Sequence, residues 1–312
     1  MISIIICTCN RSEKLRQALR SLDAMAVPAS LSWELIVVDN NSNDDTRAVI
    51  REFTKTSALK LRYIFEAQPG LSRARNHGVG EARGEIIACT DDDCIADLDW
   101  LQAIWEELNN DPALAVLGGS FFNYTLTDHV LRDKVLKERK AFTSAKHAFR
   151  LIAGGNMAFR REVFDKIGRF DPYLDVGTKF KSAGDSDFVY RAFRAGYKIV
   201  HAPNVIIHHN HGRKTEAQVL SLKRGYVLGR GAVYGKHILQ GDWVIFKLAC
   251  REIFRQSKRL AMNLIAGKPI GRQRYRIWEL IKGIALKLAC MRFTSKQARF
   301  ISKTRNEPCS DQ

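Results

Sequence analysis

Four short apolar segments, joined by helix-compatible stretches, constrain the fold of this 312-residue chain more than any other feature. They span residues 3–8, 33–38, 61–65 and 86–90. Apolar runs of this length are typical of buried strands, and regular alternation of strands and helices is typical of a parallel sheet. We therefore predict an α/β fold in which helices flank a mainly parallel central sheet.

Polar and charged residues follow three of the predicted strands at the point where each strand ends. They are Thr8, Asn10 and Arg11 after the first strand, Asp39 after the second, and Asp91, Asp92 and Asp93 after the fourth. Ligands of such sheets bind at the carboxyl ends of the strands, so we expect these loops to converge on one crevice. Taken alone, Asp91–Asp93 is equally compatible with a simple acidic turn.

The residues of this crevice indicate a nucleotide and a metal ion. Carboxylate oxygens are preferred ligands of Mg²⁺ and Mn²⁺. Arg73 and Arg75, at the start of the helix before the fourth strand, offer positive charge for phosphate groups. The sequence has neither a Walker loop nor a Gly-x-Gly-x-x-Gly turn, so it supports neither a P-loop fold nor a dinucleotide-binding fold.

Several motifs occur in a fixed order along residues 2–214. They are Thr-x-Asn-Arg at 8–11, Gly-Leu-Ser-x-Ala-Arg-Asn-x-Gly at 70–78, Asp-Asp-Asp at 91–93, Gly-Gly-Asn-x-x-Phe at 154–159, Gly-x-Phe-Asp at 168–171 and Asp-Ser-Asp-Phe at 185–188. Together they resemble the inverting glycosyltransferases of family 2, which have the GT-A fold. The resemblance covers about two thirds of the chain.

The resemblance implies a role for each matched residue. It implies binding of the nucleotide-sugar donor by Thr8, Asn10, Arg11, Asp39, Arg73, Arg75, Asn76, Asp91 and Asp92, metal binding by Asp91 and Asp93, acceptor binding by Gly155, Asn156 and Asp187, and base catalysis by Asp185. The base bound by Asp39 is usually uracil in this family, which makes UDP the favoured nucleotide. The implied metal ion is Mn²⁺ or Mg²⁺.

Residue 184 departs from the pattern of this family, which commonly has Glu directly before the catalytic Asp. This chain has Gly184 there. If Gly184 leaves a gap, we expect acceptor contacts or local electrostatics to differ from the usual pattern. Asp185 is the predicted base and Asp187 the second choice, although both acids would also fit the N-cap and first turn of a helix.

The resemblance implies transfer of a sugar, with inversion, from a nucleotide-diphosphate sugar to a hydroxyl of a glycan or a lipid-linked acceptor. The departing diphosphate needs positive charge, and the acceptor hydroxyl needs a base. One alternative is a nucleotidyltransferase, but residues 8–12 contain no glycine for a pyrophosphate loop. Another is a nucleic-acid-binding protein, but no reader motif is recognisable and the acidic crevice would repel phosphates. We therefore expect no nucleic-acid partner.

The positive charge of the chain is concentrated in its C-terminal third. Residues 213–305 hold 22 Lys and Arg against 4 Asp and Glu, and the whole chain has a net charge of +17. Amphipathic patterns span 243–265 and 277–288. We predict a catalytic domain over residues 1–214 and a basic helical extension over 215–312. Basic amphipathic helices bind anionic lipids, so we expect a peripheral membrane surface, with packing on the catalytic domain as the alternative.

The cysteines and the absence of apolar spans indicate a cytoplasmic protein, with peripheral binding to the cytoplasmic face of a membrane. The seven cysteines form no Cys-x-x-Cys pair, which favours reduced thiols. The chain shows no signal peptide and no run of about 18 uncharged apolar residues. We interpret His208, His209 and His211 as a polar strand end, with a metal or phosphate contact as the less favoured alternative.

Overall fold

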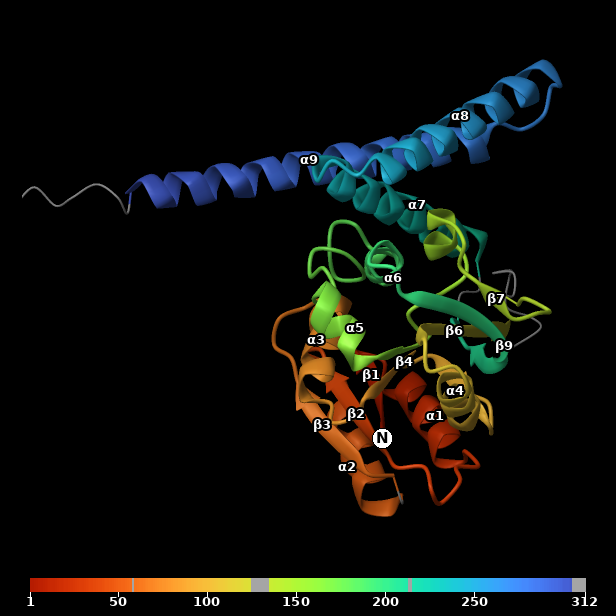
Figure 1. Ribbon diagram of the computed structural model, residues 1–312, viewed down its shortest axis with the longest axis vertical. Helices are drawn as coiled ribbons and strands as arrows, with labels where there is room; N and C mark the ends of the chain where they lie inside the picture. The colour runs from red at the N-terminus through yellow and green to blue at the C-terminus, as the bar shows by residue number, and fades with distance from the viewer. Residues whose placement is uncertain (58, 125–134, 213–214, 305–312) are drawn as a thin grey trace, which may run out of the picture. The chain divides into compact units, whose positions relative to one another are not determined.

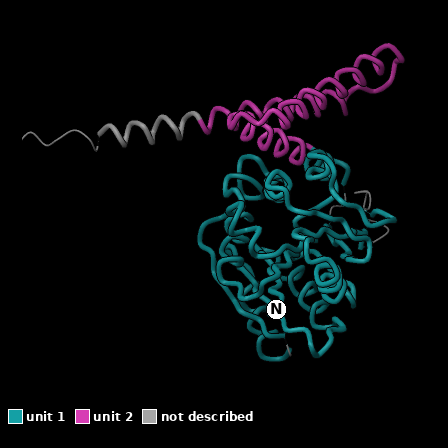
Figure 2. Tube along the Cα trace, viewed as in Figure 1, with its two compact units in different colours: residues 1–223 teal, residues 224–312 magenta. Residues whose placement is uncertain are grey.

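The computed structural model describes residues 1–57, 59–124, 135–212 and 215–304, without the side chains of 292–304. The chain divides into two compact units, residues 1–223 and residues 224–312 (Figure 2). The domain boundary that we predict after residue 214 adjoins residues 213–214, which lie outside the described residues.

The first unit contains most of the secondary structure (Figure 1). Its elements are β1 (Ile2–Thr8), α1 (Ser12–Asp23), β2 (Trp33–Asp39), α2 (Thr46–Thr56), β3 (Leu61–Phe65), α3 (Leu71–Glu81), β4 (Ile86–Asp91), β5 (Cys94–Ala96), α4 (Trp100–Asn110), β6 (Leu114–Asn123), β7 (Lys140–Ala141), the 3-10 helix η1 (Ala145–Phe149), β8 (Asn156–Arg160), α5 (Arg161–Ile167), α6 (Gly184–Arg194) and β9 (Lys198–His209). The four predicted N-terminal strands all form, with nearly the predicted bounds.

The strands form one sheet in the order β3-β2-β1-β4-β8-β6-β9-β5, with β7 paired to β9. β1 runs parallel to β2 and β4, and β2 runs parallel to β3. β8 is antiparallel to both of its neighbours, β4 and β6. The predicted α/β fold, a mainly parallel sheet flanked by helices, is confirmed.

The register of the sheet brings the predicted loops to one edge. Thr8 pairs with Asp39 across β1 and β2, and Cys7 pairs with Asp91 across β1 and β4. Asn156, the first residue of β8, pairs with Thr90 near the end of β4 because these strands are antiparallel. The carboxyl ends of β1, β2 and β4 therefore lie beside the Gly-Gly segment that precedes β8.

Close packing fixes the helix that carries Arg75. A Cβ on Gly78 of α3 would meet side-chain atoms of Ile5 at 2.7 Å and of Val38 at 3.0 Å. The helix therefore lies directly on β1 and β2, and only a glycine fits at this point. This contact positions the buried side of α3 at the edge where the loops converge.

A cluster of phenylalanines joins α6 to the sheet. The ring of Phe188 on α6 lies 4.4 Å from that of Phe170 and 4.9 Å from that of Phe159 on β8, measured between centroids. Phe159, Phe170 and Phe188 are all fully buried. Aromatic pairs at such separations stabilise beyond their buried area by about 0.5–1.5 kcal/mol. The cluster holds the start of α6 near the sheet edge.

One sequence interpretation needs correction. From the sequence alone, Pro203 splits residues 197–200 and 205–208 into two strands, whereas the structure has one strand, β9, from Lys198 to His209. The pairing of β9 with β6 shifts register between Gly118 and Ser120, and Pro203 lies in that irregular stretch, where a missing N–H costs no ladder bond. The helix α7 (Glu216–Leu239) falls within the predicted helical extension but precedes both of its amphipathic patterns.

The second unit consists of the later part of α7 together with α8 (Trp243–Ile265) and α9 (Gly271–Thr304), in agreement with the predicted helical extension. Glycines allow α7 and α9 to approach closely. A Cβ on Gly231 would collide with the carbonyl oxygen of Leu280, and one on Gly235 would meet that of Ile284 at 2.8 Å. No helix in the described part of the chain is long and apolar enough to cross a membrane.

Candidate functional site

The acidic turn after β4 is neutralised by the loop after β1. Arg11 donates hydrogen bonds to Asp92 at 2.8 Å and to Asp93 at 2.7 Å, and Thr8 donates from Oγ1 to Asp92 at 2.9 Å. Asp92 and Asp93 are both buried. A buried carboxylate without a partner is costly, so this pairing is what allows the turn to enter the interior.

The two carboxyl groups of this turn titrate differently. Burial raises the pKa of Asp92 to about 7, although Arg11 opposes the shift. Burial also acts on Asp93, but hydrogen bonds and charge from His209 and Arg11 outweigh it and hold the pKa of Asp93 below its usual range. Asp93 is therefore the acid of the pair that is firmly ionised at neutral pH.

Asp39 ends β2 as a buried carboxylate. Its Oδ1 accepts a hydrogen bond from the backbone N–H of Ser42 at 2.9 Å, and its Oδ2 accepts one from the hydroxyl of Tyr63 at 3.1 Å. Asn10 lies beside this loop, because its Oδ1 accepts from the N–H of Asn43 at 2.7 Å. Asp39 is fixed at the carboxyl end of its strand, with an aromatic ring beside it.

Arg75 is the buried cation of the site. It contacts Asp91 at 2.9 Å and Asp175 at 3.7 Å, and these two carboxylates keep its pKa above the usual value although burial opposes this. A Cβ on Gly154 would lie 2.7 Å from the guanidinium nitrogens, so Gly154 is what allows β8 to approach Arg75. Arg75 thus links β4 to the segment before β8.

Arg73 and Asn76 lie on the same helix but outside this cluster. Arg73 donates to the side chain of Gln68 at 2.8 Å, in an exposed contact. The amide of Asn76 donates to the carbonyl oxygen of Phe170 and accepts from its N–H, both at 2.9 Å. Asn76 therefore ties α3 to the Gly-x-Phe-Asp turn, a contact inside the fold.

Asp185 lies in the first turn of α6 and faces the Gly-Gly segment. Its Oδ2 accepts a hydrogen bond from the N–H of Gly154 at 2.8 Å, and its Oδ1 accepts from the N–H of Ser186. Asp187 is fully buried instead and pairs with Arg191 at 2.9 Å, within the same helix. Only Asp185 of these two is half-exposed at the cluster.

Gly155 and Asn156, predicted to contact the acceptor, occupy different environments. A Cβ on Gly155 would lie 2.6 Å from Oδ2 of Asp91, so the glycine lies against the acidic turn. Asn156 is buried, and its amide binds Trp100, Ser120 and Val205 within the fold. The side chain of Asn156 thus joins α4, β6 and β9.

Asp175 is a site residue that our sequence analysis did not identify. Its carboxylate accepts hydrogen bonds from Ser72 Oγ and from the N–H of Gly184, both at 2.7 Å, and contacts Arg75. Burial raises its pKa to about 6, against the opposing effect of Arg75. The gap considered at Gly184 does not exist, since Asp175 fills it. In the sequence, the only sign of this arrangement was Gly184, at the position where the family commonly has Glu.

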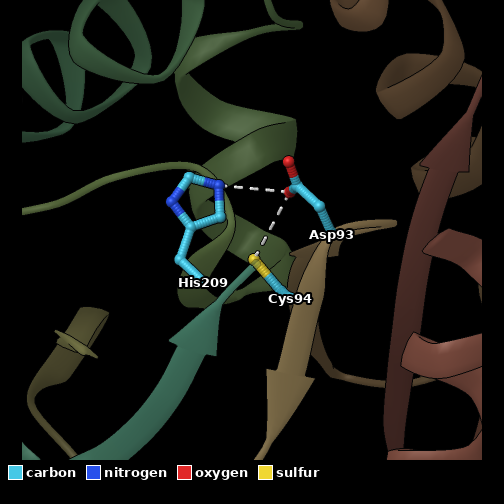
Figure 3. Close-up of side chains that lie close together, drawn as sticks. All are labelled: Asp93, Cys94 and His209. Atoms are coloured by element: carbon cyan, nitrogen blue, oxygen red, sulfur yellow. Dashed lines mark hydrogen bonds and ion pairs between the residues drawn. The ribbon is translucent and has the colours of Figure 1, made fainter. Parts of the chain in front are cut away.

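One histidine of the predicted strand end joins the acidic turn. His209 Nε2 lies 3.2 Å from Oδ1 of Asp93, and the sulfur of Cys94 lies 4.0 Å from the same oxygen (Figure 3). These three side chains could hold a metal ion. Asp91 is not in this group, and its Oδ1 is paired with Arg75 at 2.9 Å. His208 stacks on Phe122 instead, with 5.8 Å between ring centroids.

Family comparisons agree with this arrangement of loops. Residues 3–168 match the family described as Glycosyl transferase family 2, and residues 86–296 match the one described as Glycosyl transferase family group 2. The chain belongs to glycosyltransferase family 2. The family resemblance that we drew from the motifs is therefore confirmed, and the protein is an enzyme.

This family 2 glycosyltransferase is similar in sequence to several other proteins. It is 26% identical over 278 residues to glycosyltransferase AglE of Haloferax volcanii. This alignment covers 85% of this chain and 80% of AglE. It is 30% identical over 208 residues to the succinoglycan biosynthesis protein ExoM of Rhizobium meliloti, and this alignment covers 66% of each chain.

Solved structures show that this family 2 glycosyltransferase has the predicted GT-A fold. Mannosyltransferase PcManGT from Pyrobaculum calidifontis, solved with GDP-Man and Mn²⁺, aligns with a TM-score of 0.62 and 19% identity over 93% of this chain and 86% of that one. S. aureus TarS 1–349 with UDP-GlcNAc aligns with a TM-score of 0.53 and 19% identity, over 73% and 66%. At this identity the likeness shows the fold alone.

Proposed function

We propose that this enzyme transfers a sugar, with inversion, from a nucleotide-diphosphate sugar, with UDP as the favoured nucleotide, to a hydroxyl of a glycan or lipid-linked acceptor. One observation carries the proposal. Gly154 lies against the guanidinium of Arg75 and donates its N–H to Asp185, so a cation and a half-exposed carboxylate flank the same point. Transfer needs these two groups, one for the leaving diphosphate and one for the acceptor proton.

The carboxyl ends of the first two strands suit the nucleoside. Asp39 offers carboxylate oxygens to a base N–H, and beside it lies Tyr63, whose hydroxyl donates to Asp39 and whose ring has the guanidinium of Arg47 over one face. Support for a nucleotide donor comes from the fold neighbours, which were solved with GDP-Man and UDP-GlcNAc. A carboxylate accepts from the N–H of uracil as readily as from that of guanine, so the choice of UDP follows the motif resemblance.

A divalent ion, Mn²⁺ or Mg²⁺, fits the donor set at the acidic turn. Asp93 offers an ionised oxygen and His209 a ring nitrogen, and both suit such ions. Cys94 suits them poorly, because burial raises the pKa of its thiol and keeps it protonated. Asp91 could complete the set from the end of β4. When bound, the ion would neutralise negative charge on the leaving diphosphate.

Asp185 is the proposed general base. It would take the proton of the acceptor hydroxyl while the oxygen attacks the anomeric carbon from the face opposite the diphosphate. The bond between this carbon and the phosphate oxygen breaks, and the configuration inverts. Arg75, held between Asp91 and Asp175, would bind the negative charge on the phosphate side.

A donor screen tests the proposed reaction. The enzyme is incubated with UDP-, GDP- and dTDP-sugars, with Mn²⁺, Mg²⁺ or EDTA, and both sugar release and thermal shift are measured. We expect a UDP-sugar to give the largest thermal shift and metal-dependent release. Release from a GDP- or dTDP-sugar alone would overturn the UDP assignment, and neither release nor shift with any donor would overturn the reaction.

The acceptor side of the proposal includes a membrane surface on α8. Trp243, Phe254 and Ile265 share one face of this helix and are 68%, 71% and 89% exposed. Lys247 and Lys258 flank this face and are exposed. Exposed aromatic and aliphatic side chains beside lysines are typical of helices that lie in the headgroup region of anionic bilayers. We propose that α8 brings the enzyme to lipid-linked acceptors.

Vesicle flotation tests this surface. We expect the full chain to float with anionic liposomes, and the triple variant Trp243→Ser, Phe254→Ser, Ile265→Ser to remain in the soluble fraction. Val244→Ser with Met262→Ser is the matched control, because both residues are exposed on α8 but lie outside that face. Equal flotation of the triple variant and the wild type would refute the membrane surface. Cys7, Cys89 and Cys94 are buried thiols outside any disulfide, which supports a cytoplasmic location.

A further inference from the structure

The carboxylate of Asp175 occupies the space that any side chain at residue 184 would need. A Cβ on Gly184 would collide with Oδ2 of Asp175 and would lie 2.5 Å from Oγ of Ser72. The φ angle of Gly184 is outside the left-handed region, because this residue already belongs to α6. Glycine is therefore required at 184 by the presence of Asp175 and not by the backbone.

The backbone at Asp175 gives the opposite result. Asp175 has a φ of 73°, in the left-handed region that favours glycine. An aspartate in such a conformation is retained only where its surroundings hold it. The two positions are therefore complementary. Residue 175 is an aspartate although its backbone favours glycine, and residue 184 is a glycine although its backbone accepts any residue.

The contacts of Asp175 join the two sides of the proposed reaction. On the donor side it binds Ser72 of α3 and lies 3.7 Å from Arg75, which contacts Asp91 at 2.9 Å. On the acceptor side it accepts the N–H of Gly184, the residue directly before Asp185. One carboxylate therefore fixes both the buried cation and the helix start that carries the proposed base.

We propose that Asp175 is a positioning residue, and that it supplies from a loop the carboxylate that the motif resemblance leads one to expect at residue 184. It holds the guanidinium of Arg75 toward the leaving group and the first turn of α6 toward the acceptor. The inference rests on the proposed function for its kinetic part, since Arg75 and Asp185 have their roles there. The coupling between residues 175 and 184 is independent of that function.

Substitutions that move the carboxylate from residue 175 to residue 184 test the inference. Asp175→Asn keeps the shape but removes the charge, and we expect kcat to fall by about 10–100-fold with little change in KM for the donor, as for a misplaced catalytic group. Gly184→Glu alone should lower the melting temperature, because its Cβ meets Asp175. The double variant Asp175→Gly with Gly184→Glu should recover the melting temperature and most of kcat.

A second double variant separates space from charge. Asp175→Gly with Gly184→Ala relieves the collision without restoring a carboxylate, so we expect it to melt above Gly184→Glu but below the wild type, and kcat to remain low. Asp165→Asn, an exposed acid on α5, is the control for the loss of one negative charge and should leave kcat unchanged.

Two results would overturn the inference. One is wild-type kcat in Asp175→Asn. The other is equal kcat in the two double variants, which would show that a carboxylate at either position has no role in turnover. If the wild-type chain itself released sugar from no donor, the proposed function would fail. The inference would then be tested by melting temperatures alone. It would be overturned if the change in melting temperature of a double variant equalled the sum of the changes in its two single variants.

Discussion

The two compact units of this glycosyltransferase place their charges in opposite environments. In residues 1–223 the charges that matter are buried and paired: Arg75 lies between Asp91 and Asp175, and Arg11 binds the acidic turn. In residues 224–312 the basic side chains of α8 are exposed. These exposed lysines and arginines lie beside equally exposed aromatic residues.

The difference shows that burial, and not charge itself, decides what an ionic side chain does. Removing one partner of a buried pair leaves the other charge without solvent or counter-ion, so the pair cannot be changed at one end without large loss. An exposed lysine keeps its water and contributes little to stability, so it remains available to bind a surface of opposite charge. The following predictions test this contrast, from the largest effect to the smallest.

Asp185→Asn should give the largest effect on turnover. Loss of the proposed base should lower kcat by about 10²–10⁴-fold, while the thermal shift caused by the donor persists, because the donor contacts lie elsewhere. Single-turnover kinetics and donor titration measure the two quantities. Asp165→Asn serves as the control, and an unchanged kcat in Asp185→Asn would remove Asp185 as the base.

Arg75→Met should destabilise the first unit strongly. It leaves Asp91 and Asp175 without their cation, so we expect the free energy of unfolding to fall by about 3–5 kcal/mol, together with loss of turnover. Arg73→Met on the same helix is the matched control, since Arg73 makes an exposed contact with Gln68 and should cost less than about 0.5 kcal/mol. Chemical denaturation measures both values, and equal losses would contradict the contrast.

Replacing exposed lysines of α8 should affect membrane binding alone. Lys247→Gln with Lys258→Gln should weaken binding to anionic vesicles by about 2 kcal/mol at low salt, because each lysine near such a surface contributes about 1 kcal/mol. Stability and sugar release in solution should stay at wild-type values. Lys55→Gln with Lys60→Gln removes the same charge from exposed positions of the first unit and should leave vesicle binding intact. A loss of binding in both double variants would indicate a non-specific charge effect.

The smallest effect should be a pH dependence of stability due to Asp175. Its pKa is raised in the folded protein to about 6, from a usual value near 4, so the folded state binds this proton more tightly than the unfolded state. The resulting stabilisation is complete below about pH 4 and is lost as the pH rises through about 6. The charged groups that face Asp175 are Arg75 and Asp185.

Melting curves between pH 4 and 7.5 measure this effect. The melting temperature of the wild type should fall with rising pH relative to that of Asp175→Asn, by about 2–4 °C for each kcal/mol lost. Parallel curves for the two proteins would show that Asp175 keeps its ordinary pKa.

Much of the fold could be predicted because its signals are local. The apolar runs at β1, β2, β3 and β4 and the polar residues that follow them depend on a few neighbouring positions. The rule that ligands meet the carboxyl ends of parallel strands then brought Thr8, Asp39 and Asp91 together correctly. The strand β9 was predicted less well, since whether Pro203 interrupts a strand depends on an irregularity in the pairing with β6.

The sequence by itself determined the family, the order of the strands in the chain and the loops that converge at one edge of the sheet. Tertiary structure decided which side chains meet there: Asp175 with Arg75, and His209 with Asp93. It also directed Asn76 and Asn156 into hydrogen bonds within the fold. The physical reason is that motif and periodicity record neighbours along the chain. Burial and ion pairing depend instead on residues that the sheet and the loops bring together from far apart.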